Sequence, residues 1–353
     1  MITKEETLIK KLPVWPLRSV AIRLHGGTQV GWGHVVRHVH FGKQLISQWK
    51  VKLLFVVEGD PAILDYITSK GFDFVNFDHG VEESDVVNTV LENFPCDLVI
   101  MDMLHATEDR QLCWQSEKRG LVLFDELCRF KHRADMVVCA QLLPKYPNID
   151  KTSGKVQYCH GVEYFVLPES FLSLREKQGE RSGVLVSLGG AVPIHIYQKI
   201  LQALVVCKHL NEVVTCVLGY AVSDQEVREL SEKYPKVQFL ESVNNMSELM
   251  MQNRCAVLAA GFVKYEAACL GLPQILVACY DHQIPIAQIF EDKQIARFAG
   301  SVDQLDAFAL RDIFDDYLNS TDAMQSMARE AMKMVDGRGA SRVIEAMTEV
   351  FAY

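Results

Sequence analysis

A glycine-rich segment near the start of the chain is the first place where residue types and spacing could do chemistry. Residues 25–34 read His-Gly-Gly-Thr-Gln-Val-Gly-Trp-Gly-His, between an apolar run and an amphipathic stretch. Glycines let a ligand approach the backbone closely, and the start of the following helix offers unpaired N–H groups that favour an anion. His34 would project into the same space, where the positive end of the helix disfavours its charged form and suits it to act as a base. The same residues would also make an ordinary tight turn capped by a histidine.

Two glycine turns in the second half of the chain could hold an anionic ligand. Gly189 and Gly190 follow one apolar run, and Gly261 follows another. Glu266 lies about one turn into the helix predicted after Gly261, where a carboxylate can accept hydrogen bonds from a ribose diol. Sharp turns and an exposed helix glutamate would account for the same pattern without a ligand.

Two polar residues follow a third predicted strand in this half. His282 and Gln283 come soon after the apolar run 274–278. Polar side chains at the carboxyl end of a parallel strand point toward the ligand cleft. An ordinary helix start would also place polar residues here.

Composition narrows the class of protein. The chain has 353 residues, 49% of them hydrophobic and 23% charged, and its formal net charge is −9. This charge argues against a protein that tracks nucleic-acid phosphates. No apolar run reaches the ~18 residues of a membrane helix, and the charged N-terminus lacks the apolar core of a secretion signal, so we expect a cytoplasmic protein with no membrane span. The ten cysteines form no CxxC pair, which fits buried reduced thiols, and we predict no metal site.

Helices and strands must position the candidate residues, and the hydropathy pattern predicts two series of them. Short apolar runs alternate with amphipathic stretches from Ser19 to Cys139 and again from Gly183 onward, which is typical of βαβ units around a parallel sheet. We therefore predict an α/β protein with two Rossmann-like domains facing each other across a cleft, the usual place for a small-molecule site. The predicted division is an N-terminal fringe at 1–17, a domain at 18–160, a linker at 161–182, a nucleotide-binding domain at 183–335 and a C-terminal helix at 336–353 that returns toward the N-terminal domain.

Together these segments resemble a known family. The chain is similar to the UDP-2,4-diacetamido-2,4,6-trideoxy-beta-L-altropyranose hydrolases of pseudaminic acid biosynthesis and their relatives, within the GT-B glycosyltransferase-like superfamily. The features that carry the resemblance span nearly the whole chain. They are Gln29–His34 with Arg37, Asp102, Phe124-Asp125-Glu126, Gly189-Gly190, Glu266 with Gly271-Leu272-Pro273, Gln283, and the tail Val335–Ala340.

The resemblance implies a reaction and a set of roles. The family hydrolyses the anomeric C–O bond of a UDP-linked amino or deoxy sugar, inverts the anomeric centre, releases UDP and uses no metal or other cofactor. His34 would be the general base for water. The resemblance places the phosphates and ribose on Gly189, Gly190, Gly261 and Glu266, and the sugar side on Arg23, His25, Gln29, Gly31, Gly33, His282 and Gln283.

The sequence departs from the family pattern at several of these positions. His25 stands where an acidic residue is usual, Phe262-Val263 replaces a hydroxyl-bearing turn, and His282 replaces an asparagine. These changes touch sugar and phosphate contacts. Two alternatives therefore stand beside the hydrolase: a GT-B glycosyltransferase in which the same base activates a hydroxyl acceptor, and a non-catalytic nucleotide-sugar binding protein. A CMP-linked sugar stays open beside a UDP-linked one.

Overall fold

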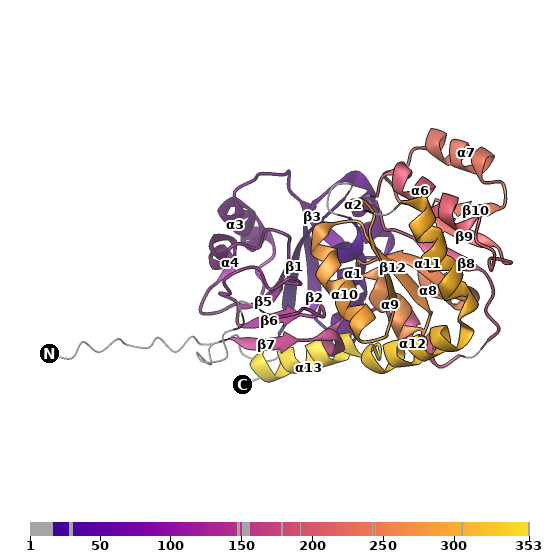
Figure 1. Ribbon diagram of the computed structural model, residues 1–353. Helices are drawn as coiled ribbons and strands as arrows, with labels where there is room; N and C mark the ends of the chain where they lie inside the picture. Colours follow the sequence, from indigo (N-terminus) through magenta and orange to yellow (C-terminus); the bar gives the residue numbers. More distant parts are fainter. Residues whose placement is uncertain are drawn as a thin grey trace.

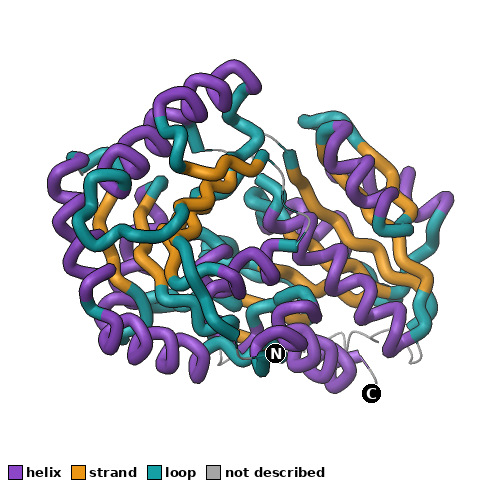
Figure 2. The backbone as a smooth tube through the Cα atoms, turned by 90° about the vertical axis from the view of Figure 1, so that its right-hand side faces the viewer, coloured by secondary structure: helices purple, strands orange, loops and turns teal. Residues whose placement is uncertain are grey.

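Two α/β domains make up the part of the chain that the structure describes. The computed structural model describes residues 17–27, 31–146, 149, 156–177, 179–190, 192–241, 243, 245–304 and 306–351. Each domain has a parallel sheet with helices on its faces (Figure 1). Figure 2 shows the two units side by side, with the strands of each lying between its helices. The prediction of two Rossmann-like domains with a cleft between them is confirmed.

The N-terminal sheet has seven parallel strands in the order β3-β2-β1-β4-β5-β6-β7. The strand order reverses between β1 and β4, and ligands of open α/β sheets bind outside the carboxyl ends of strands at such a point. The strands are β1 (Ser19–Gly26), β2 (Lys52–Gly59), β3 (Asp73–Asn76), β4 (Leu98–Asp102), β5 (Gly120–Phe124), β6 (Met136–Cys139) and β7 (Gln157–His160). The helices are α1 (Gly33–Trp49), α2 (Pro61–Ser69), α3 (Glu83–Asn93) and α4 (Glu108–Trp114).

The C-terminal sheet has six parallel strands in the order β10-β9-β8-β11-β12-β13, so its order reverses between β8 and β11. Its strands are β8 (Val184–Ser187), β9 (Val214–Val217), β10 (Val237–Leu240), β11 (Cys255–Ala259), β12 (Gln274–Ala278) and β13 (Arg297–Ser301). Its helices are α6 (Ile194–Leu204), α7 (Asp224–Lys233), α8 (Met246–Gln252), α9 (Val263–Cys269), α10 (Ile284–Asp292), α11 (Ala307–Asn319) and α12 (Thr321–Met334), with the short 3-10 helix η2 (Asp281–Gln283) before α10.

The central strands β4, β5, β11 and β12 are apolar except for Asp102 at the end of β4 and Gln274 at the start of β12, because helices cover both faces of each sheet. Every residue of β4, β5, β11 and β12 is buried. Continuous apolar runs of this kind are typical of parallel sheets and explain why these strands were predictable from sequence.

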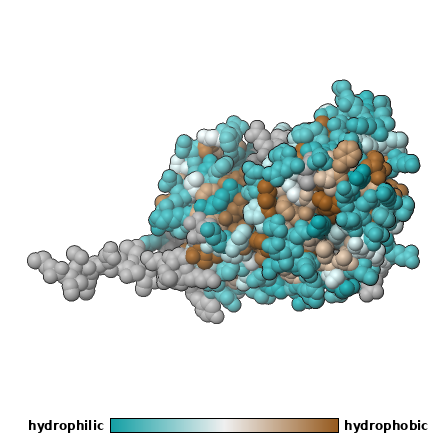
Figure 3. Space-filling view, viewed as in Figure 1, coloured by the Kyte–Doolittle hydropathy of each residue, from teal (hydrophilic) through white to brown (hydrophobic). Residues whose placement is uncertain are grey.

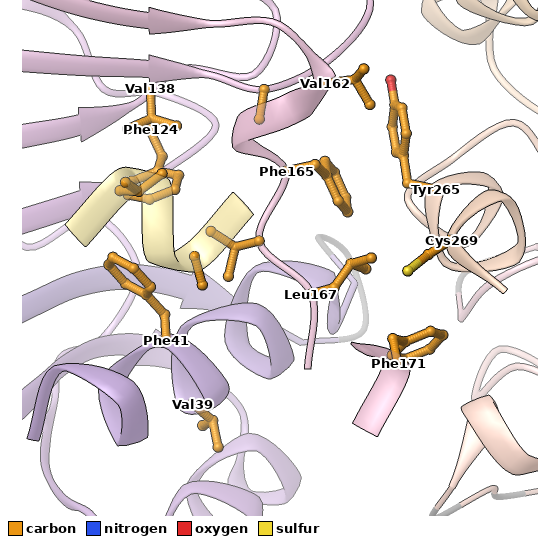
Figure 4. Packing of buried hydrophobic residues seen from close by; sticks show 14 of the residues in the cluster. Val39, Phe41, Phe124, Val138, Val162, Phe165, Leu167, Phe171, Tyr265 and Cys269 are labelled. Atoms are coloured by element: carbon orange, nitrogen blue, oxygen red, sulfur yellow. The ribbon is translucent and has the colours of Figure 1, made fainter. Parts of the chain in front are cut away.

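The segment that joins the domains is part of one shared core. It contains the 3-10 helix η1 (Val162–Tyr164) and the helix α5 (Glu169–Arg175). The Phe165 ring lies 4.3 Å from the Tyr265 ring of α9, measured between centroids. Figure 4 shows Phe165 and Leu167 between Phe41 and Phe124 of the N-terminal domain and Tyr265 and Cys269 of α9. The joining segment therefore packs against both domains.

The helix α13 (Gly339–Phe351) packs against the N-terminal domain after the chain has completed the C-terminal one. It contacts β6, β7, η1 and α1, and Figure 1 shows it (yellow) beside β7. Val343, Met347 and Phe351 on its inner face are fully buried. A Cβ added to Gly120 at the start of β5 would lie 2.5 Å from the Phe351 ring, so the strand needs glycine there.

Hydrophilic residues dominate the face of the molecule shown in Figure 3. Within the described ranges, no helix combines the length and apolar character needed to cross a membrane. All ten cysteines are free, and eight of them are buried.

Candidate active site

A cleft of about 650 Å³ lies between the domains. From the N-terminal domain it is lined by residues at the carboxyl ends of β4 and β5, among them Asp102 and Glu126. From the C-terminal domain it is lined by the turns after β8 and β11, which contain Gly190 and Gly261. The two points at which the strand orders reverse therefore face each other across one space.

Three side chains of α1 converge on Asp102, the last residue of β4. His34, Arg37 and His38 are spaced i, i+3 and i+4, which places them on one face of the helix. The His34 Nδ1 atom lies 2.8 Å from Asp102 Oδ1, and His38 Nε2 lies 2.8 Å from Oδ2. The Arg37 Nη2 atom donates to Oδ2 at 2.5 Å. One buried carboxylate therefore holds a base candidate, a second histidine and a guanidinium.

Asp102 sets the tautomer of His34. Burial alone would raise the pKa of this carboxyl, but Arg37, His34 and the hydrogen bonds hold it well below its usual range. An anionic carboxylate requires His34 Nδ1 to donate, which leaves Nε2 with a lone pair. The His34 side chain is 13% exposed, and it lines the cleft. An aspartate that orients a histidine in this way is the arrangement of a general base.

Arg37 links Asp102 to a second carboxylate. It also pairs with Glu126, which follows β5 and lines the cleft. Although burial opposes the charged form, Asp102 and Glu126 raise the pKa of Arg37, so it stays a cation. Burial raises the pKa of Glu126 despite the neighbouring guanidinium.

The glycine pair after β8 makes a tight, crowded turn. Gly189 has a φ of +89°, a left-handed backbone conformation that favours glycine. The Tyr197 hydroxyl donates to Gly189 O at 3.2 Å and accepts from Gly219 N at 3.1 Å, which fixes the turn. The backbone at Gly189 and Gly190 lines the cleft, where an anion can approach it closely.

We predict that Gly190→Ala destabilises the fold through one aromatic ring. An added Cβ would lie 2.1 Å from the Tyr220 ring, and the Tyr220 hydroxyl donates to Gly27 O of the other domain at 3.0 Å. Forcing the ring aside should lower the free energy of unfolding by about 1–3 kcal/mol, as overpacking does elsewhere. Urea denaturation measures this loss. In a Tyr220→Ala background the same glycine change should cost far less, and an equal cost in both backgrounds would contradict the steric explanation.

The turn after β11 is open toward the cleft. A Cβ added to Gly261 would meet only Gln283 Nε2, at 3.7 Å. Gln283 is buried, and its Oε1 atom accepts from Cys279 N at 2.9 Å, so its amide group is held in place. Glu266 of α9 lines the cleft, and burial raises its pKa to about 7.

The structure brings most of the residues predicted from sequence to this cleft. Gly31, Gly33 and His34 line it from the N-terminal domain, and His282 lies at its exposed rim, stacked on Tyr280 with an angle of 8° between the rings. Gln29 lies outside the described residues.

Arg23 and His25 do not line the cleft, in contrast to the prediction that they contact the sugar. Arg23 is 1% exposed, and its guanidinium pairs with Glu83 at 2.9 Å and Glu58 at 3.2 Å, toward the layer of α3 and α4. The buried His25 ring lies 5.8 Å from the His34 ring, and its Nε2 atom accepts from Leu104 N at 3.0 Å. Burial, with His34 close by, lowers the pKa of His25 to about 4.

Several site residues were given no role by reasoning from the sequence. Asp102, Arg37 and Glu126 entered only as features of a family resemblance, and His38 was given no role. The i, i+3, i+4 spacing of His34, Arg37 and His38 was the available signal, together with an acidic residue at the end of β4.

Sequence comparison finds relatives that align with nearly the whole chain. No protein-family model matches the chain. The chain is 25% identical over 346 residues to the spore coat polysaccharide biosynthesis protein SpsG of Bacillus subtilis, an alignment that covers 94% of this chain and 98% of that protein. It is 24% identical over 352 residues to the uncharacterized protein MJ1062 of Methanocaldococcus jannaschii, covering 94% of this chain but only 66% of the archaeal protein.

Solved structures identify the fold. MurG of Acinetobacter baumannii superposes with a TM-score of 0.66 at 13% identity, covering 94% of this chain and 99% of that one. The UDP-GlcNAc 2-epimerase of Neisseria meningitidis, bound to UDP-GlcNAc, gives 0.66 at 12%, covering 94% and 100%. LpCGTa in complex with UDP gives 0.67 at 11%, covering 96% and 100%. The chain therefore has the GT-B glycosyltransferase-like fold.

Proposed function

We propose that this protein is a nucleotide-sugar hydrolase that cleaves the anomeric C–O bond of a UDP-linked amino or deoxy sugar. The observation that carries the proposal is the His34–Asp102 pair, which faces two glycine turns across an interdomain cleft. The solved structures of similar fold include enzymes bound to UDP or UDP-GlcNAc. The family resemblance of the sequence supports hydrolysis as the reaction.

The proposed chemistry uses the residues of both domains. Water attacks the anomeric carbon from the side of His34, whose Nε2 atom takes a proton from it, and Asp102 stabilises the imidazolium that forms. The bond between the anomeric carbon and the phosphate oxygen breaks, and UDP leaves with the electron pair. Attack opposite to the leaving group inverts the anomeric centre.

The leaving diphosphate needs positive groups around it. The backbone N–H groups of Gly189, Gly190 and Gly261, which line the cleft, are the proposed donors to it, and Arg129 stands exposed on the opposite wall. Lys264 lies beneath the Gly261 turn, where burial lowers its pKa to about 7. Glu266 is the proposed acceptor for the ribose hydroxyls, while Gln283 and His282 border the same space.

An isotope experiment tests the proposed reaction. The protein is incubated with UDP- and CMP-sugars in H₂¹⁸O, and released nucleotide and product mass are followed. We expect ¹⁸O on the sugar, none on the phosphate, and an initial product with inverted anomeric configuration by NMR. Label on the phosphate would refute C–O cleavage. Nucleotide release only when a hydroxyl acceptor is added would establish the glycosyltransferase instead, and binding without release would leave a binding protein.

UDP affinity should depend on the ionisation of Glu266. Because two ribose hydroxyls donate to its carboxylate in the proposed complex, binding favours the ionised form and releases a proton. Affinity should therefore rise as pH increases through about 7, the raised pKa of this group. Glu266→Gln should weaken binding by about 1–3 kcal/mol at high pH and remove this dependence. Calorimetry between pH 5.5 and 8.5 measures the loss of UDP affinity and its pH dependence. The diphosphate also ionises in this range, but its effect is the same for wild type and Glu266→Gln and cancels when the two are compared. Parallel pH curves would exclude the ribose role.

A further inference from the structure

An aromatic residue of the C-terminal domain touches the candidate base in the other domain. Phe262 lies between Gly261 and the first residue of α9. Its ring makes an edge contact with the His34 ring, at 5.6 Å between centroids, and the Arg37 guanidinium carbon lies 4.9 Å from its centroid. A third contact, with Phe165 at 5.4 Å, supports the ring from the joining segment.

The N-terminal domain is shaped to receive this ring. A Cβ added to Gly33 would lie 3.0 Å from Phe262 Cδ2, which is tighter than an ordinary van der Waals contact. Glycine at position 33 therefore lets the start of α1 approach the aromatic ring closely. His34 is held by Asp102 on one side and bordered by Phe262 on another, so the contact limits how its ring can turn about the hydrogen bond.

Three hydrogen bonds hold the turn that carries Phe262. Lys264 Nζ donates to the carbonyl oxygens of Ala260 and Gly261, at 3.0 and 2.7 Å, and Tyr265 N donates to Phe262 O at 2.9 Å. A displacement of the Gly261 backbone by a bound ligand would therefore be passed to the adjacent ring.

From these contacts we infer that Phe262 is a positioning residue that couples occupancy of the Gly261 turn by a nucleoside diphosphate to the placement of His34. The inference rests on the proposed function, because it takes the nucleotide to bind at this turn. Phe262 would contact the general base, His34, and not the reacting atoms. The family resemblance predicts hydroxyl side chains at this turn, which would contact phosphate. Phe262 stands there instead and contacts His34.

NMR of the histidine side chains tests the coupling directly. The His34 Cε1–H signal, assigned by its loss in His34→Gln, is recorded with and without UDP. We expect UDP to shift this signal in the wild type and to shift it much less in Phe262→Leu, although UDP still binds. The control is Phe308→Leu, a matched change at a 72% exposed phenylalanine on α11, which should behave as wild type.

Kinetics separate a positioning role from a merely structural one. Phe262→Leu should lower kcat by about 10- to 100-fold, because a displacement near 1 Å can cost that much, while UDP affinity stays nearly unchanged. Gly33→Ala moves the same ring from the other domain and should give the same pattern, which keeps the test available if Phe262→Leu folds poorly. Loss of UDP affinity with unchanged kcat would place Phe262 in the nucleotide site and overturn the coupling. UDP binding that leaves the wild-type His34 signal unmoved would overturn the coupling alone, whereas no UDP binding by the wild type would overturn the proposed function as well.

Discussion

His34→Ala is expected to lower turnover by about 10²–10⁴-fold, the usual contribution of a general base. The loss is expected because His34 is the histidine of the described cleft lining that a buried carboxylate orients. Asp102 holds its Nδ1 atom, and its Nε2 atom keeps a lone pair that can accept a proton. UDP affinity should change little, because the proposed nucleotide contacts belong to the other domain. Steady-state kinetics on the substrate found by the nucleotide-release assay, with calorimetry for UDP, measure the two effects.

His25→Ala is the matched control for this prediction. The two histidine rings are neighbours, but the His25 Nε2 lone pair already accepts a backbone N–H, and burial keeps its pKa near 4. Its replacement should therefore cost far less turnover than that of His34. The opposite ranking would assign the base to His25, and full activity in both variants would favour the binding protein.

Asp102→Asn should impair both turnover and stability. An amide cannot serve three donors as the carboxylate does, so His34 loses its fixed tautomer, and turnover should fall by about 10²–10⁴-fold. Breaking a buried ion pair should also reduce the free energy of unfolding by about 3–5 kcal/mol. Because the pKa of Asp102 lies well below its unfolded value of about 3.9, this stabilisation is fully present above that value and is lost progressively as pH falls from there through the lower pKa of the folded state. Urea denaturation at pH 7 and pH 3.5 should show a smaller difference at the lower pH.

Glu83→Gln separates the two effects of the Asp102 change. Glu83 forms a buried ion pair with Arg23 in the same domain but outside the cleft. Its replacement should lower stability while turnover on folded protein stays near that of wild type. If Asp102→Asn loses stability but keeps its turnover, the carboxylate supports the fold only.

Much of the fold could be predicted because parallel strands buried on both faces leave continuous apolar runs in the sequence. The strand β13 (Arg297–Ser301) gives a much weaker signal, because this edge strand reads Arg-Phe-Ala-Gly-Ser and has no such run. The strand β7 (Gln157–His160), at the edge of the other sheet, gives a weak signal for the same reason, since polar residues stand at both of its ends.

The site was harder to predict than the fold. Glycine turns and His34 carry local signals, but the partners of His34 come from β4 and the other domain, which spacing alone does not bring together. Arg23 is a different case, because the family resemblance implied a sugar contact for it that the structure does not show. In the structure its two acidic partners lie 35 and 60 residues further along the chain and hold it on the other face of the sheet.

The docking of α13 onto β6 and β7 has a consequence for biosynthesis. Domains generally fold as units while the ribosome extends the chain, the N-terminal one first. Here Val343, Met347 and Phe351 belong to the core of the N-terminal domain, so this part of its core is filled only after the C-terminal domain has been translated. During that delay the apolar surface of β5–β7 that α13 covers is exposed, and chaperones can bind it. A translation product that stops after α12 would keep this surface exposed, which would favour its degradation by proteases.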